Sequence, residues 1–365
     1  MKRIMVSPET EKALAVLRDD HESGAQALAL KALDLLSKAV QSDEIGGLGT
    51  SREFWTELRW RAWHLAKNGR PSMGPAIEAA LFRTLEDVRT KLKILSPESL
   101  DAVALSTLKS TTESAISATI EMKKHSLEKL AKHFVEFIEI DRNNEQVIKL
   151  VTLSSSGTIT QSLALLVESL VQKGLDIKIS VLESRPKFEG AAFVNNLLSR
   201  FKDNAAVIDK LKVEIVSDAS IATVVKDANY FVFGGDKVIP NGDMSNKIGS
   251  LAAAVVMRTL NPAGKIIALF ETDKITGSGF DSGHLKVEYN DEAELMDAWP
   301  ASSVAGIKEK RKQRFQVEVN NAYFEWVPAD YIYRYISEEG PLTKEEIGKL
   351  GAESEELEKR LFRDL

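Results

Sequence analysis

Residues 230–275, YFVFGGDKVIPNGDMSNKIGSLAAAVVMRTLNPAGKIIALFETDKI, decide the fold of this chain. The apolar run Tyr230–Phe233 stops at two glycines, which predicts a buried strand that ends in a tight turn. After a polar segment, Ile248–Leu260 is rich in small apolar residues and is predicted to be a helix. Lys265–Phe270 then has the composition of a second buried strand. The stretch is therefore predicted to be a βαβ unit, and open α/β sheets bind ligands at the carboxyl ends of such strands.

The polar segment between the first strand and the helix is predicted to be a loop that carries the function. It contains Asp236, Lys237, Asn241, Asp243, Asn246 and Lys247. Gly242 and Gly249 permit close approach of the backbone, and the helix N-terminus beyond them favours an anion. Asp243 offers a base, Asn246 a hydrogen-bonding amide and Lys247 a cation for a phosphate. We therefore expect the site in this loop, with Asp236 bracing it.

The rest of the chain divides into two parts with different patterns of apolar residues. Apolar residues at three- and four-residue spacing predict one helix over 8–40, and there is no glycine between Gly74 and Gly157, so residues 1–140 are predicted to be an all-helical domain. From Gln146 onward, short β-branched runs alternate with helical stretches, which indicates a doubly wound parallel sheet. The predicted fold class is α/β, with a Rossmann-like domain over 141–347 and a charged helical tail over 348–365.

Composition excludes several classes of function. The chain has 365 residues, 44% of them hydrophobic, and a net charge of −6, so it offers no electrostatic case for general binding to nucleic acid or to a membrane surface. The basic run Lys308–Arg314 is better explained as a solvated face. The absence of cysteine excludes disulfides and thiolate chemistry, and the histidine spacing gives no metal site. No stretch approaches the roughly 20 apolar residues of a membrane span, so we expect a cytoplasmic protein.

The amino-acid sequence of the predicted loop resembles a known family signature. GGDKVIPNGDMSNKIGS, residues 234–250, is similar to the segment shared by the alpha, beta and delta subunits of initiation factor two-B, the methylthioribose-1-phosphate isomerases and the ribose-1,5-bisphosphate isomerases. Four further segments resemble the same superfamily in the same order, so the resemblance covers roughly residues 20–345. They are HESGAQALALKALDLL from His21, NGRPSMGPAIEAAL from Asn68, VLESRPKFEGAAF from Val181 and NAYFEWVPADYI from Asn321.

These segments have the chemistry of a sugar-phosphate pocket. Arg70 and Arg185 can each hold a phosphate with two parallel hydrogen bonds. The turn Ser154–Thr158 follows a predicted strand and can bind an anion with its hydroxyl and N–H groups, although simple helix capping also explains such a turn. The complete set of predicted ligand-binding residues is Gly24, Ala25, Arg70, Ser155, Ser156, Gly157, Thr158, Arg185, Asn246 and Lys247.

The resemblance implies a specific catalytic pair, and this chain departs from it. The isomerases use a cysteine after the first strand together with an aspartate, whose matching positions here are Ser154 and Asp243. A serine hydroxyl is a poor general acid or base without an activating partner. The factor subunits usually lack both residues, so this chain keeps half of the pair.

Three functions follow from these observations. The first is a factor-like regulatory subunit that binds a phosphorylated sugar or nucleotide between the two domains. The second is an aldose–ketose isomerase acting on a ribose-1-phosphate-type substrate, with Asp243 in proton transfer. The third is a structural partner with a relic pocket. No cofactor is expected, and the resemblance implies a homodimer or an assembly with related factor subunits.

Overall fold

The first part of the chain folds as a bundle of helices, in a computed structural model that describes residues 7–20, 23–70, 73–153, 155–277, 287 and 289–365. Buried apolar side chains such as Leu28, Phe54 and Ile77 recur at helical spacing and form one core. The elements are α1 (Pro8–Arg18), α2 (Ala25–Gln41), α3 (Asp43–Gly46), α4 (Ser51–Asn68), α5 (Gly74–Lys91), η2 (Pro97–Ala102) and α6 (Leu105–Asp141). The single helix predicted over 8–40 is thus wrong: α1 ends at Arg18, and α2 begins after Gly24, a residue that disfavours helix interiors.

The second part of the chain contains a seven-stranded sheet in the order β12-β11-β7-β4-β1-β2-β3. All neighbouring strands are parallel except β12, which runs antiparallel to β11. The strands are β1 (Val147–Thr152), β2 (Asp176–Leu182), β3 (Leu211–Val216), β4 (Tyr230–Gly234), β7 (Lys265–Leu269), β11 (Arg334–Ser337) and β12 (Gly340–Leu342). The direction of strand addition reverses between β1 and β4, which is the point where doubly wound sheets bind ligands.

Helices cover both faces of this sheet. One face packs against α6, α7 (Gly157–Gln172), α8 (Glu189–Ser199) and α9 (Ala205–Lys210). The other face packs against α10 (Ile221–Val224), α11 (Ser250–Leu260) and α14 (Lys344–Phe362). The predicted fold class, a helical region followed by a Rossmann-like doubly wound sheet, is confirmed.

The segment predicted as a polar loop is instead a hairpin. β5 (Lys237–Val238) and β6 (Met244–Lys247) pair antiparallel, and β10 (Phe324–Val327) adds to β6. Gly242 in the connecting turn has φ +90°, which favours glycine. The dipeptide Asn241-Gly242 is a strong hairpin signal that the sequence prediction did not use.

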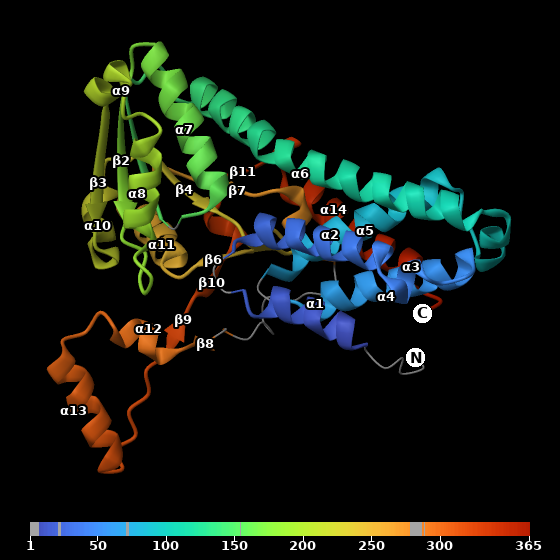
Figure 1. The fold of residues 1–365 in the computed structure, drawn as a ribbon. Coiled ribbons are helices and arrows are strands. Elements are labelled where there is room, and N and C mark those ends of the chain that lie inside the picture. The colour runs from blue at the N-terminus through green and yellow to red at the C-terminus, as the bar shows by residue number, and fades with distance from the viewer. Residues whose placement is uncertain (1–6, 21–22, 71–72, 154, 278–286, 288) are drawn as a thin grey trace.

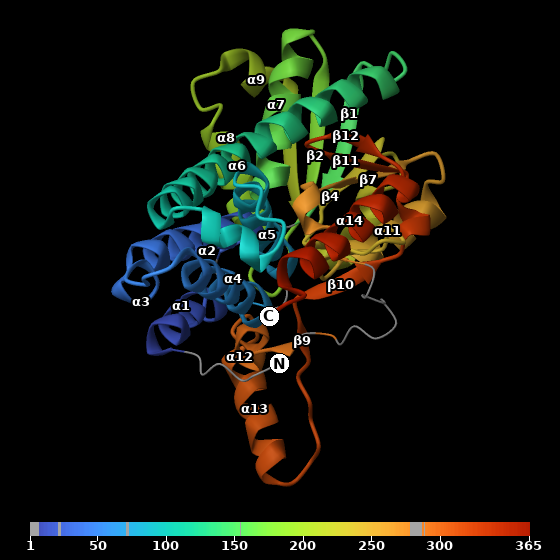
Figure 2. The same ribbon diagram turned by 90° about the vertical axis from the view of Figure 1, so that its right-hand side faces the viewer.

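Two late segments differ in how they lie relative to the compact body: one extends away from it, and the other packs against it. β8 (Tyr289–Asn290), α12 (Glu292–Met296), α13 (Ala301–Lys312) and β9 (Asn321–Ala322) form an arm that extends away from both parts (Figure 1). The basic run lies mostly on α13, none of whose residues is buried. By contrast, α14 returns to the helical bundle beside α5 (Figure 2), where the rings of Phe362 and Phe82 lie 4.7 Å apart. Among the described helices, none has the length and apolarity needed to cross a membrane.

Candidate functional site

A small polar pocket lies at the switch point of the sheet, where the loops after three neighbouring strands meet. Ser155 and Ser156 follow β1, Lys187 and Glu189 follow β2, and Gly234 ends β4. The cavity has a volume of about 130 Å³. Its other lining residues are Ser23, Gly24, Arg70, Met73, Gly235, Asp236, Asn246, Lys247, Tyr323 and Phe324. The pocket therefore draws on the sheet loops, on the β5–β6 hairpin and on the helical bundle.

Arg70 is the principal contribution of the helical bundle. It follows α4 and is only 5% exposed. Its Nη1 donates to the carbonyl oxygens of Asp20 at 3.0 Å and Ser23 at 3.4 Å, while its Nε is buried without a hydrogen-bond partner among the described residues. Within the described residues no carboxylate lies at ion-pair distance from its guanidinium. The arginine thus fixes the segment before α2 and retains donors for an anion.

Two helix N-termini open at the same pocket. Gly24 is the N-cap of α2 and has no side chain with which to cap it. Ser156 is the N-cap of α7, and its Oγ accepts a hydrogen bond from the backbone N–H of Ile159 at 3.1 Å. The helices have 17 and 16 residues, so each presents unpaired N–H groups and the positive end of its macrodipole. Convergence of two such ends with Arg70 favours a phosphate-sized anion.

Another part of the pocket lining comes from β6 and from Tyr323 and Phe324 at the start of β10. The ammonium group of Lys247 lies 5.0 Å from the centre of the Tyr323 ring and 5.6 Å from that of Phe324, and it is paired with Glu189 at 3.0 Å. Asn246 is 3% exposed, and its Nδ2 donates to Ser250 Oγ at 2.8 Å. An amide oxygen such as that of Asn246 can accept a hydrogen bond from a ligand hydroxyl.

Asp236 is the pocket residue whose acid–base properties are most altered. Burial raises the pKa of its carboxyl group, and the nearby Lys274, Lys247 and Arg70 oppose that rise. Lys274 in turn donates to the carbonyl oxygen of Gly235 at 2.7 Å and so supports the backbone beside Asp236. A buried carboxyl with a raised pKa that lines a polar pocket is suited to accept and return a proton.

The structure brings together six of the ten predicted ligand-binding residues, namely Gly24, Arg70, Ser155, Ser156, Asn246 and Lys247. The other four are not among the lining residues. Ala25, Gly157 and Thr158 are the first residues of α2 and α7, behind the N-caps. Arg185 lies in the loop after β2, with its guanidinium 5.3 Å from the Phe188 ring and its buried Nε and Nη2 without a partner in the described chain.

The predicted catalytic residues have different outcomes. Ser154 lies outside the described residues. Asp243 is not in the pocket: it sits in the turn of the β5–β6 hairpin, where its Oδ1 accepts from the backbone N–H of Ala329 at 2.9 Å and its Oδ2 from Asn241 Nδ2 at 3.1 Å. Because β5 and β6 pair antiparallel, Asp236 and Asn246 lie at the open end of the hairpin and Asp243 lies at its turn. The expected position of Asp243 beside the other predicted site residues is therefore wrong, whereas Asp236 lines the pocket; a catalytic role for either carboxyl stays a prediction.

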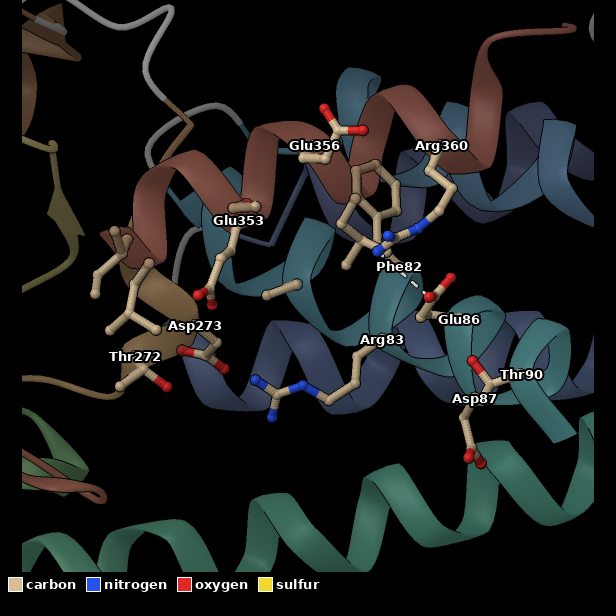
Figure 3. A pocket seen from close by; sticks show the side chains of 15 residues that line it. Phe82, Arg83, Glu86, Asp87, Thr90, Thr272, Asp273, Glu353, Glu356 and Arg360 are labelled. Atoms are coloured by element: carbon tan, nitrogen blue, oxygen red, sulfur yellow. Dashed lines mark ion pairs between the residues drawn. The ribbon is translucent and has the colours of Figure 1, made fainter. Parts of the chain in front are cut away.

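A larger cavity of about 640 Å³ lies between α5, α14 and η4 (Thr272–Lys274), and Figure 3 shows its lining. Glu86, Asp87, Asp273, Glu353 and Glu356 contribute carboxylates there, against the guanidinium groups of Arg83 and Arg360. Glu86 and Arg360 are paired with each other at 3.3 Å. This excess of negative charge disfavours a phosphate, so the size of the cavity does not make it the sugar-phosphate site.

The family model for the Initiation factor 2 subunit family matches residues 21–344. Among curated relatives, a methylthioribose-1-phosphate isomerase from Ricinus communis is 27% identical over 222 residues, which cover 59% of this chain and 54% of that protein. A ribose 1,5-bisphosphate isomerase from Archaeoglobus fulgidus is 22% identical, over 66% of this chain and 73% of its own length. The chain spans about half the length of the curated relatives it matches first.

Solved structures share the fold over nearly the whole chain. The translation initiation factor eIF-2B of Pyrococcus horikoshii superposes with a TM-score of 0.61 and 17% identity, covering 92% of this chain and 97% of that one. The 5-methylthioribose 1-phosphate isomerase of the same organism gives 0.63 at 17% identity, over 95% of this chain and 88% of that one. At such identities the likeness establishes the fold alone. Because the family model matches residues 21–344, well over half of the chain, this chain belongs to the Initiation factor 2 subunit family.

Proposed function

We propose that this protein binds a phosphorylated sugar in the pocket at the switch point of its sheet and acts as a regulatory, factor-type subunit. The observation that carries the proposal is the convergence of Arg70 with the N-termini of α2 and α7. Two helix N-termini together with an arginine side chain form a strong anion site. The cavity of about 130 Å³ is small beside typical ligand pockets and favours a sugar phosphate over a nucleotide.

A second candidate function, aldose–ketose isomerisation, is favoured by the position of Asp236. Such an isomerase must move a proton between adjacent carbons of the opened sugar, and Asp236 is a pocket carboxyl with a raised pKa. The chain has no cysteine to share this work. We therefore rank catalysis below ligand binding, and we transfer the proton-transfer role from Asp243 to Asp236.

The first test is thermal stability of the purified protein with a panel of sugar phosphates, AMP and GMP, followed by product analysis of every ligand that stabilises it. A ligand at a hundredfold excess over its dissociation constant adds about 2.7 kcal/mol. A stabilising sugar phosphate recovered unchanged supports the regulatory function, and conversion to its ketose supports the isomerase. Absence of any stabilisation would contradict both and leave a relic pocket in a structural partner.

If turnover is found, two matched variants assign it. Asp236→Asn is expected to abolish turnover while sugar phosphate still binds, because the amide cannot accept a proton. Asp243→Asn is the control, since an amide oxygen still accepts from Ala329 and the residue lies in the hairpin turn. Loss of turnover only in the Asp243 variant would refute the reassignment. A homodimer, or assembly with related factor subunits, stays a prediction that sedimentation analysis can test.

A further inference from the structure

Another cavity, of about 280 Å³, lies in the helical bundle between α4, η2 and the C-terminal end of α14, and its lining is basic. We call it the arginine cavity. Its charged lining residues are Arg52, Arg59, Arg89, Arg360, Arg363 and Asp364. Five guanidinium groups thus line one cavity together with a single carboxylate, in a chain whose net charge is −6.

Carboxylates outside the lining compensate only part of this positive charge. The ion pairs are Arg52 with Asp101 at 2.7 Å, Arg89 with Glu86 at 2.6 Å, and Arg360 with the same Glu86 at 3.3 Å (Figure 3). Arg363 is exposed, and among the described residues no carboxylate lies at ion-pair distance from it. When Asp364 is included, three carboxylates accompany the five guanidinium groups, which leaves an excess of two positive charges.

One arginine of the cavity already holds an anionic group in the geometry that a ligand would need. The Arg59 side chain is 8% exposed, and its Nη1 and Nη2 donate to the two carboxylate oxygens of Asp364 at 2.6 and 3.0 Å. Two such parallel hydrogen bonds are the arrangement in which arginine binds carboxylates and phosphates. Because Asp364 is itself 48% exposed, an anion from solution can reach this pair and compete for Arg59.

The arginine cavity is separate from the pocket at the switch point of the sheet. Arg52 and Arg59 lie in the first half of α4, whereas Arg70 follows the end of the same helix. A rise of 1.5 Å per residue places the backbone of Arg59 roughly 15 Å from that of Arg70, and the backbone of Arg52 roughly 25 Å from it. No described residue lines both cavities.

We propose that the arginine cavity is a second ligand site, which takes a small phosphate monoester with an apolar organic group. A phosphate monoester carries about 1.5 to 2 negative charges at pH 7, which matches the excess of two positive charges. Its oxygens replace the Asp364 carboxylate on Arg59. The organic group lies against Ile94 and Leu95, and Leu95 is 82% exposed. The volume of about 280 Å³ is near the lower end of ligand pockets and suits a small molecule.

The test is isothermal titration of the full chain with phenyl phosphate, and with benzoate as the singly charged comparison. The wild-type protein is expected to bind phenyl phosphate at least about tenfold more tightly than benzoate. The double variant Arg52→Gln/Arg363→Gln should weaken phenyl phosphate binding by at least about tenfold. Arg314→Gln is the matched control, because it removes an exposed arginine outside the cavity, and it should change the affinity by less than about twofold.

Asp364→Asn tests the same site in the opposite direction. It removes the negative charge that competes for Arg59, so phenyl phosphate should bind about threefold more tightly or better. Unchanged or weaker binding in Asp364→Asn would overturn the inference, as would equal affinities in the double variant and in Arg314→Gln. Arg70→Gln should leave phenyl phosphate binding unchanged, and its loss there would place the probe in the other pocket. Failure of the wild-type protein to bind phenyl phosphate also overturns the inference, while the proposed function stands on its own test.

Discussion

Replacement of Lys123 by methionine tests how the helical bundle is joined to the sheet. Lys123 lies on α6, is 4% exposed and pairs with Asp273, which is 7% exposed, in the segment that follows β7. The neighbouring Glu271 is 2% exposed and accepts a hydrogen bond from Ser126. Lys274, the other cation of this buried cluster, is committed to the carbonyl oxygen of Gly235. Loss of Lys123 therefore leaves two buried carboxyl groups facing one lysine.

The expected cost follows from that imbalance. Methionine fills nearly the same volume, so the loss is electrostatic and leaves no cavity. Breaking one side of a buried ion pair costs about 3–5 kcal/mol, because the remaining charge stays desolvated. The double variant Lys123→Met/Asp273→Asn removes both charges and is expected to recover at least about 2 kcal/mol of the loss. Lys124→Met is the control: its side chain is 56% exposed, and its pair with Glu121 lies at the surface, where solvent screens it, so little loss of stability is expected.

The assay is urea denaturation at neutral pH, with the free energy of unfolding and its denaturant slope compared among the four proteins. A loss below about 1 kcal/mol in Lys123→Met would refute the reasoning, because the buried pair would then contribute no more than a surface one. A double variant no more stable than the single one would also refute it. In that case, the loss would come from packing and not from the unpaired carboxylate.

The same variant has a pH dependence whose sign can be worked out. Burial and the neighbouring Asp273 raise the pKa of Glu271 in the folded state, while Lys274 and Lys123 oppose that rise. A carboxyl with a raised folded-state pKa binds a proton more readily when folded, so its unfavourable effect is present at high pH and is relieved as pH falls through the raised pKa. The deficit of Lys123→Met relative to the wild type should therefore shrink between about pH 8 and pH 5. Urea titrations at both ends of that range measure it.

Three further predictions concern the pocket and its supports. Arg70→Lys keeps the charge but loses the planar fork, and titration calorimetry should show sugar-phosphate binding weakened by about tenfold or more; unchanged affinity would show that Arg70 does not hold the phosphate. Gly190→Ala should lower the stability by about 1–3 kcal/mol, because a Cβ there would lie 2.0 Å from the backbone oxygen of Leu182; Gly306→Ala, with open space around it, is the control in thermal denaturation. Glu325→Ala should cost about 1–2 kcal/mol in urea denaturation, since its carboxylate caps α11 by accepting from the N–H groups of Gly249 at 2.6 Å and Leu251 at 2.9 Å; a loss no larger than that of an exposed glutamate would contradict this role.

Local sequence determined the fold class and most of the pocket's chemistry. Alternating β-branched runs and helices after Gln146 are enough to indicate a doubly wound sheet, because the period of apolar residues reports which faces are buried. The carboxyl ends of parallel strands meet at one edge, so the loops after Thr152, Leu182 and Gly234 had to converge. The β5–β6 hairpin also has a local sequence signal, the dipeptide Asn241-Gly242.

Only the tertiary structure decided which carboxyl faces the pocket and how the two parts are joined. Asp236 and Asp243 are seven positions apart on one segment, and the antiparallel pairing of β5 with β6 places the first at the pocket and the second at the hairpin turn, beside Ala329. Lys123 and Asp273 are 150 positions apart in the sequence. Leu361 packs in the core of the helical bundle although all the strands of the sheet lie between that bundle and Leu361 in the sequence. Such contacts depend on burial that no local pattern encodes, because each partner's charge or apolar surface is stabilised only by a residue distant in sequence.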